Sequence, residues 1–407
     1  MWTGLIAIVA AAGGLIMMYE NPATRGKQFS EINFLAMNSI VGMLILVSAI
    51  NLLTVFIGLE LMSLSLYLLI AMSHEQKLSK EAALKYFVLG SFASALFLYG
   101  VSFVFGSVNT ITITDFMQNA GTLITSNKLF LFGICFVFLG FCFKVSIVPF
   151  HAWTPDVYQG APTPVTSFMA TAVKTASFAA FLRLAATNSM AGSQNLVDVL
   201  QWLAVITMVV GNVGAILQNN LKRVLAYSSI AHSGYLLVGL IAVGVGQNSA
   251  GAASSVVFYL LTYSVMTMGA FAIVSMMERN ENEHLTNESL SGFAKNQPLL
   301  ALCLTVFLLS MAGLPPTLGF FGKLYLFSAA VSEQLLWLAL WGVINSVISV
   351  FYYLRPIVMM YMKTGDANVA DHSLQATTIT VIVSAVFILF VGFFSGPLYE
   401  LVEKSLG

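Results

Sequence analysis

Stretches of about twenty mostly apolar residues follow one another through the whole chain, about twelve in all. A segment of this length crosses the hydrocarbon core of a bilayer, where only helices and closed barrels satisfy their backbone polar groups. Charged residues make up 8% of the 407 residues, whereas soluble domains carry about 25%. The sequence therefore predicts an all-α membrane protein with about twelve transmembrane helices and no soluble domain.

The chain is predicted to form a single polytopic membrane domain over residues 1–407. An N-terminal helix and loop (1–30) and a C-terminal helix (374–407) flank two units of five helices (31–187 and 196–363). The expected spans are 2–19, 31–50, 51–72, 82–106, 128–150, 162–187, 198–218, 223–247, 252–277, 298–331, 334–362 and 374–397.

Basic residues are unevenly shared between the two sets of loops, and cytoplasmic loops normally carry more Lys and Arg. The loops after even-numbered spans have only Lys128, Arg183 and Lys404 near helix ends. We therefore expect the loops after odd-numbered spans to face the cytoplasm and both termini to face the periplasm or its equivalent. The loops after odd-numbered spans contain Arg25, Lys27, Lys77, Lys80, Lys222, Arg223, Arg279, Lys295 and Lys363.

Two of the expected spans contain helix-breaking residues. Pro149 lies near the end of the fifth span, and Gly313, Pro315 and Pro316 lie within the tenth. Proline removes a backbone donor and clashes with the preceding turn. Interrupted helices at matching positions of two halves are typical of transporter sites. Because each unit has five helices, an odd number, the second unit would be inverted relative to the first. The alternative is that these breaks have no special role, since Gly and Pro also occur in ordinary membrane helices.

Five ionisable side chains lie inside apolar segments: Glu60, Lys85, Lys144, Lys174 and Lys323. A charge at the bilayer centre costs roughly 2.5–3.5 kcal/mol, and such residues usually mark an ion or proton path. Burial disfavours a charged lysine and a neighbouring carboxylate favours it, so proton exchange can be tuned. We expect Glu60 and Lys144 to form a direct or water-bridged pair.

Each of these residues also has a plainer interpretation. Each of the four lysines could extend to the interface along its apolar stem, and Glu60 could simply join two helices by a hydrogen bond. His232, among hydroxyl residues, could relay protons or be structural. For His151, at the exit of the fifth span, the structural interpretation is favoured.

Sites for metals, redox groups and nucleic acids are not indicated. The three cysteines, Cys135, Cys142 and Cys303, lie in apolar segments without a CxxC or Cys/His cluster, so no iron–sulfur, haem or zinc site is expected. The net charge is zero, which gives no support for nucleic-acid binding. No catalytic residue, cofactor or metal is therefore predicted within this chain.

Several segments resemble one known family. They are GLELMSLSLY (58–67), SKEAALKYFVLGSFASALFLYG (79–100), FKVSIVPFHAWTPDVYQGAPTPV (143–165), LKRVLAYSSIAHSGYLL (221–237) and MAGLPPTLGFFGKLY (311–325). In these segments the chain closely resembles the N subunit of the proton-translocating NADH:quinone oxidoreductase, respiratory complex I. The ALKYFVLGSFAS and FFGKLY blocks resemble this subunit more than its L and M paralogues.

This resemblance implies roles for individual residues. Glu60 would be the carboxylate paired with Lys144 on the first broken helix, and Lys174 the central lysine of a hydrated axis. Lys323 would be the terminal lysine, where the M paralogue typically has glutamate. Lys85 matches another functional lysine, and His232 a polar link between Lys174 and Lys323.

The resemblance also implies a setting, the bacterial cytoplasmic (inner) membrane. Flavin and iron–sulfur clusters would belong to partner subunits, and quinone would be the substrate of the complex. Partners would be the lipid bilayer and other membrane-arm subunits, including the M-type paralogue and small membrane subunits. Typical members have fourteen spans, so this chain would start inside the third.

The leading hypothesis is therefore a proton-pumping subunit without redox chemistry of its own. The alternatives are a subunit of a multisubunit Na⁺/H⁺ antiporter and a non-pumping membrane scaffold.

Overall fold

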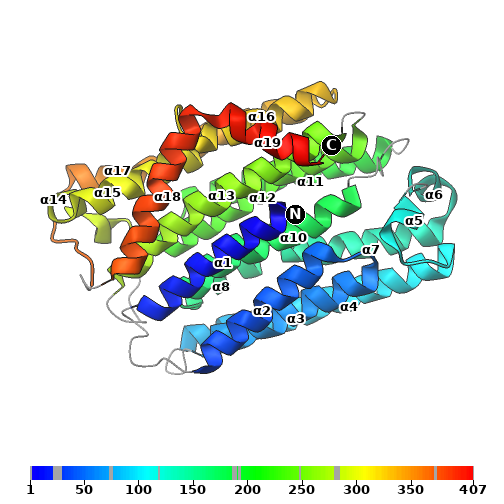
Figure 1. Ribbon diagram of the computed structural model, residues 1–407, viewed down its shortest axis with the longest axis horizontal. Coiled ribbons are helices and arrows are strands. Elements are labelled where there is room, and N and C mark those ends of the chain that lie inside the picture. The colour runs from blue at the N-terminus through cyan, green and yellow to red at the C-terminus, as the bar shows by residue number, and fades with distance from the viewer. Residues whose placement is uncertain are drawn as a thin grey trace.

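Long helices lying side by side make up almost all of the molecule (Figure 1). The computed structural model describes residues 2–21, 30–72, 77–117, 120–185, 190, 194–246, 249–278, 285–370 and 374–406. The long helices are α1 (Trp2–Glu20), α2 (Ser30–Ser48), α3 (Leu52–Ala71), α4 (Lys77–Val108), α7 (Lys128–Lys144), α10 (Lys174–Ala185), α11 (Gln194–Ile216), α12 (Leu221–Val245), α13 (Ser249–Met277), α15 (Pro298–Ala312), α16 (Leu318–Ser332), α17 (Leu336–Met362) and α18 (Gln375–Phe393).

Within the described ranges, ten helical segments are long and apolar enough to cross a membrane. The count rises to eleven if α6 (Ala120–Ser126) and α7 are taken as one span bent by 117°. The remaining expected span is divided into α15 and α16, each of 15 residues. The prediction of an all-helical membrane protein is confirmed.

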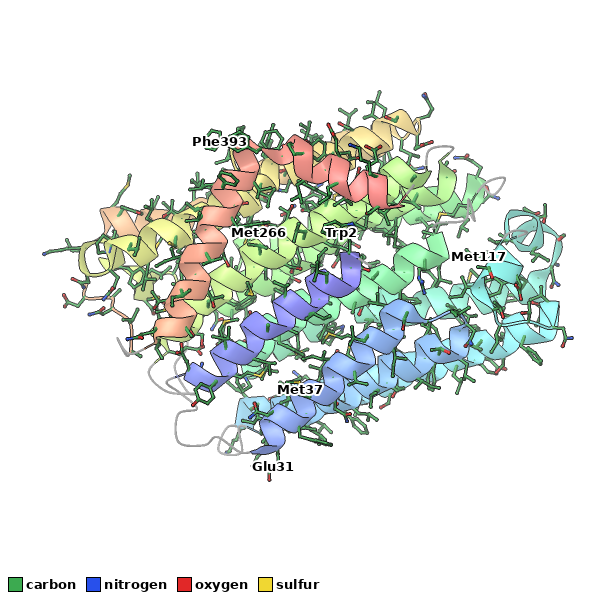
Figure 2. All side chains as sticks on the ribbon, viewed as in Figure 1. Trp2, Glu31, Met37, Met117, Met266 and Phe393 are labelled. Carbon is green, nitrogen blue, oxygen red and sulfur yellow. The ribbon has the colours of Figure 1, made fainter. Side chains whose placement is uncertain are left out.

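The outer surface of the bundle is apolar, as a lipid-facing surface requires. Figure 2 shows large side chains pointing outward from the ribbon, among them Met37 and Phe393, which are 55% and 66% exposed. Met266, in contrast, is fully buried in α13. Exposed apolar area of this extent marks a membrane or protein interface.

Asparagine side chains fix the starts of three helices. Asn51 Oδ1 accepts a hydrogen bond from the backbone N of Thr54 at 2.8 Å, so α3 follows α2 with almost no loop. Asn127 caps α7 in the same way, and Asn220 caps α12 by accepting from the backbone N of Arg223 at 3.1 Å. These caps satisfy backbone donors at the helix start, and Asn220 holds Arg223 in the first turn of α12.

Short helices occupy places where the sequence predicted loops. The 107–127 loop contains α5 (Ile113–Met117) and α6, and the 278–297 loop contains η2 (Glu288–Leu290) and α14 (Phe293–Asn296). The chain ends in α19 (Ser395–Leu406), which packs on α13. The fifth predicted span, 128–150, is helical only to Lys144, and the loop after it contains the short helix α8 (Trp153–Gly160), which lies between α4 and α12.

Glycines let α4 and α7 approach closely. A Cβ added at Gly100 would lie 2.7 Å from the carbonyl oxygen of Gly133, and one at Gly133 would lie 2.8 Å from the backbone N of Val104. Membrane helices use small residues at such contacts because packing, rather than water exclusion, holds them together. The contact matters for the site because α7 carries Lys144 at its end.

Replacing Gly100 with alanine should therefore reduce the amount of this chain in membranes, because the new methyl group meets backbone atoms that cannot move aside. We expect a loss of about 1–3 kcal/mol, as for other overpacked sites. Immunodetection in membranes, with and without brief heating, measures it. Gly106→Ala on the same helix is the control, since its nearest neighbour would be Leu129 Cδ2 at 3.8 Å. Equal amounts of both variants would contradict the prediction.

Candidate functional site

Lys144 is the last residue of α7 and lies inside the protein, 8% exposed. Its Nζ donates hydrogen bonds to Ser63 Oγ of α3 and to the Tyr86 hydroxyl of α4, each at 2.8 Å. The helix ends here, and Pro149 lies in the non-helical segment 145–152 that follows. The carboxyl end of a helix carries partial negative charge, which favours a cation at this position.

Glu60 lies on α3, half-buried, and accepts a hydrogen bond from Ser94 Oγ. The direct hydrogen bonds of Glu60 and Lys144 thus go to other residues, and the direct form of the expected pair is not present. A cavity of about 20 Å³ is lined by Ser63, Ser94 and Lys144, so it touches the hydrogen-bond partners of both charges. That volume holds about one water molecule, and a water-bridged pair stays a prediction.

Lys174 follows an irregular turn in the sixth span. Here α9 (Thr163–Phe168) passes into a π-helical turn, η1 (Met169–Val173), before α10 begins at Lys174. Such turns are frequent at functional sites. Lys174 is 4% exposed, and its Nζ donates to the Ser229 carbonyl and, at 2.6 Å, to Ser229 Oγ.

Lys144 and Lys174 face the same small cavity, although they come from different helices. Its volume is about 10 Å³, close to the lower limit for one water molecule. Tyr86, Ser146 and Tyr158 complete its polar lining. The two lysines are therefore neighbours across a space that a slight widening would hydrate.

His232 continues the line of polar groups beyond Lys174. It lies one turn after Ser229 on α12, so the two side chains share a helix face. Its Nδ1 lies 2.6 Å from the Tyr259 hydroxyl and its Nε2 lies 3.1 Å from the Tyr353 hydroxyl. Both ring nitrogens have a partner that can donate or accept, which is what a proton relay requires.

Lys323 reaches back from α16 to the break in the tenth span. Its Nζ donates to the carbonyls of Met311 (2.9 Å) and Ala312 (3.1 Å), and to Ser346 Oγ (2.9 Å). α15 ends here because Gly313 adopts a left-handed conformation, φ +85°, with Pro315 and Pro316 following it. With 4% exposure, Lys323 is buried rather than extended to the interface.

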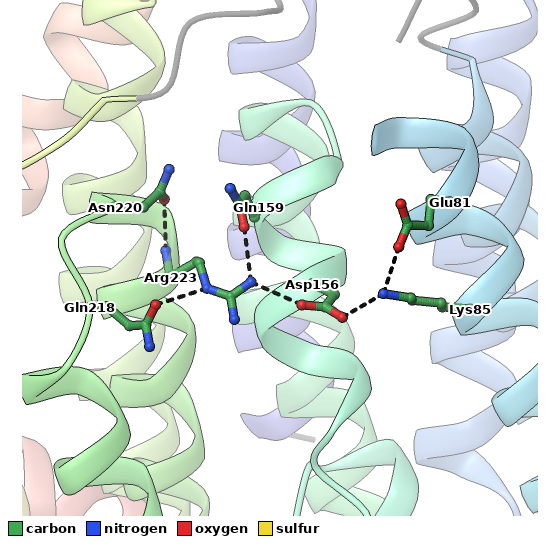
Figure 3. Close-up of polar contacts among 7 residues, drawn as sticks. All are labelled: Glu81, Lys85, Asp156, Gln159, Gln218, Asn220 and Arg223. Atoms are coloured by element: carbon green, nitrogen blue, oxygen red, sulfur yellow. Dashed lines mark hydrogen bonds and ion pairs between the residues drawn. The ribbon is translucent and has the colours of Figure 1, made fainter. Parts of the chain in front are cut away.

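Lys85 lies apart from this buried row, with its side chain 42% exposed. It forms ion pairs with Glu81 (2.7 Å) and with Asp156 of α8 (2.8 Å). Asp156 in turn binds Arg223 of α12 at 2.9 Å (Figure 3). Neither Asp156 nor the role of Arg223 was predicted from the sequence, because Asp156 lies between two expected spans and Arg223 lies at the very start of one.

A second ion pair was also missed by the sequence analysis, which assigned Lys222 to a loop. Lys222 and Glu278 are more than nine-tenths buried, with Nζ and Oε1 3.6 Å apart. Lys222 also donates to the Ala161 carbonyl at 2.8 Å, and Thr163 Oγ1 donates to Glu278 at 2.6 Å. The pair joins the turn between α8 and α9 to the ends of α12 and α13.

Comparison with known proteins gives a consistent assignment. Residues 49–349 match the family model described as NADH:quinone oxidoreductase/Mrp antiporter, TM. NADH-quinone oxidoreductase subunit N of Bdellovibrio bacteriovorus is 68% identical over 405 residues, which cover 100% of this chain and 83% of that protein.

Solved structures show the same fold. A chain of respiratory complex I from Thermus thermophilus with bound aureothin is 33% identical, with a TM-score of 0.83, over 98% of this chain and 84% of that one. A chain of the Mrp complex from Dietzia sp. has a TM-score of 0.85 over 100% of this chain and 83% of that one, at 18% identity.

Proposed function

Because this chain belongs to the N-subunit family of NADH-quinone oxidoreductase, we propose that its buried lysines carry protons through the membrane. The chain is an antiporter-like membrane subunit of that translocase. The proposed row consists of Glu60, Lys144, Lys174, His232 and Lys323.

The cavity shared by Lys144 and Lys174 is the main support for this row. Lys144 and Lys174, on separate helices, line one small cavity, and each is held only by neutral hydrogen-bond partners. Lysines buried in membrane helices usually mark an ion or proton path, and a buried lysine can exchange a proton. A single water entering the cavity would connect the two amines.

The orientation of the chain in the membrane is part of the proposal. Two units, 31–187 and 196–363, would be related by inversion, each with one broken helix that ends beside a lysine. Both termini would face the periplasm, and the side with Asp156 and Arg223 would face the cytoplasm. The bias of basic residues toward that side supports this orientation.

Electron transfer would take place in other subunits. Flavin and iron–sulfur clusters would lie in partners, and quinone would be reduced by the complex as a whole. The apolar surface of the bundle would contact lipid, the M-type paralogue and small membrane subunits. The energy for pumping would then reach this chain as a conformational or electrostatic signal.

Sealed vesicles containing the whole complex test the transported ion. NADH with a quinone acceptor should acidify the vesicle interior at the same rate in sodium-free buffer and in sodium buffer. The fold shared with the Mrp complex makes Na⁺/H⁺ exchange the second candidate. Acidification that requires sodium, or sodium uptake that accompanies it, would favour that candidate instead.

A further inference from the structure

Asp156, on the short helix α8, connects the two five-helix units, 31–187 and 196–363. Figure 3 shows its carboxylate between Lys85 of α4 and Arg223 of α12, with Oδ2–Nζ 2.8 Å and Oδ1–NH1 2.9 Å. Arg223 is itself held by Gln159 (2.9 Å) and Gln218 (3.0 Å). Each carboxylate oxygen of Asp156 thus binds a cation from a different half.

The same helix shapes the surroundings of Lys144. Trp153, one turn before Asp156 on α8, stacks on Tyr86 with ring centroids 4.5 Å apart. Its indole Nε1 donates to the carbonyl of Phe143, next to Lys144, at 2.9 Å. Tyr86 is in turn the hydroxyl partner of Lys144 and the sequence neighbour of Lys85. A shift of α8 would therefore disturb the hydrogen bonds of Lys144.

We propose that Lys85 is a positioning residue whose ion pair with Asp156 holds α8 against α4, and that it carries no transported proton. The inference rests on the proposed function, because the group it positions is Lys144. It differs from the role that the resemblance implies for Lys85 as one of the translocating lysines.

The surroundings of Lys85 favour this role. It borders neither of the cavities beside Lys144, and two carboxylates hold it in the charged form. Partial burial raises the pKa of Asp156, but hydrogen bonds from Lys85 and Arg223 outweigh it and hold that pKa below its usual range. The carboxylate is therefore ionised at neutral pH, and the link between the halves stays closed.

Arginine at position 85 separates the two roles. A guanidinium cannot release a proton under these conditions, yet it keeps the charge and reaches carboxylates well. In membranes with the assembled complex, Lys85→Arg should keep quinone-linked pumping within about twofold of the wild type. Lys85→Ala should lower it at least about fivefold, the lower end of typical coupling between linked sites.

Rates are divided by NADH oxidation with an artificial acceptor, which reports how much complex has assembled. Equal loss in Lys85→Arg and Lys85→Ala at normal assembly would overturn the inference, and so would full activity of Lys85→Ala. If the alanine variant assembles poorly, the arginine variant decides alone.

The ion-pair partner supplies a second measurement. Asp156→Asn should cause at least the loss of Lys85→Ala, because it also weakens the contact with Arg223. The double variant should be no worse than Asp156→Asn alone, because the ion pair between Lys85 and Asp156 is then already lost. Glu81→Gln should cost less than twofold, since Glu81 is exposed and lies on the same helix as Lys85. Lys80→Ala, an exposed lysine of α4, is the matched control. Additive losses would overturn the inference.

Lys174→Ala, measured in parallel, keeps the two proposals apart. Wild-type pumping in that variant contradicts the proposed function, whatever the variants at position 85 do. Loss of pumping in Lys174→Ala together with loss in Lys85→Arg contradicts only the positioning role.

Discussion

Lys174→Ala should lower NADH-driven proton pumping with a quinone acceptor by at least about tenfold. Loss of a proton-transfer group typically costs a factor of about 10²–10⁴, and water in the adjoining cavity would replace part of it. Quinone reduction should slow with pumping because the two processes are coupled. NADH oxidation with an artificial acceptor that bypasses quinone should be unchanged. Lys174 lies inside the helix bundle, where it binds Ser229, and the proposal places the redox chemistry in other subunits.

Both activities are compared in the same membranes, after immunodetection has shown normal assembly. Lys128→Ala is the control, since it removes an exposed lysine from the helix that carries Lys144. Undiminished pumping in Lys174→Ala would contradict the assignment of Lys174 as a proton carrier. Undiminished pumping in Lys144→Ala as well would favour a scaffold without a proton path.

Membrane-spanning segments could be predicted from the sequence because their signal is local. Length and apolarity decide whether a segment crosses a bilayer, and α1, α3 and α12 lie close to the expected ranges. The breaks were also local, because proline and glycine act on their own turn of helix. α7 ends before Pro149, and α15 ends at the left-handed Gly313.

The partners of the buried charges could not be predicted, since they come from distant parts of the chain. Lys144 binds Ser63 and Tyr86, on two other helices. Lys323 binds carbonyls exposed by the break in its own span, so its depth depended on how the chain turns at Gly313.

Basic residues near helix ends were the least predictable. The sequence predicted Lys85 to lie inside a span and Lys222 to lie in a loop, but Lys222 is buried and Lys85 remains partly exposed. The difference comes from the turn between α8 and α9, which places the Ala161 carbonyl over Lys222. No local pattern marks such a contact, because it depends on how the halves pack.

Lys222→Met should destabilise the subunit by about 3–5 kcal/mol, the usual cost of breaking a buried ion pair by removing one of its members. Glu278 would remain buried with its ion pair to Lys222 removed. We expect a lower temperature of half-loss of this chain from the detergent-solubilised complex. Removing Lys404 from its exposed pair with Glu400 should change little, since such pairs contribute about 0–1 kcal/mol.

The double variant Lys222→Met/Glu278→Met distinguishes loss of the ion pair from simple loss of packing. Well-packed apolar residues often replace a buried ion pair without loss of stability, so the double variant should be more stable than Lys222→Met alone. Recovery should be incomplete, because the Ala161 carbonyl and the Thr163 hydroxyl still lack their former partners. A double variant less stable than Lys222→Met would mean that the side chains act separately, and the ion pair would then not be what holds this turn.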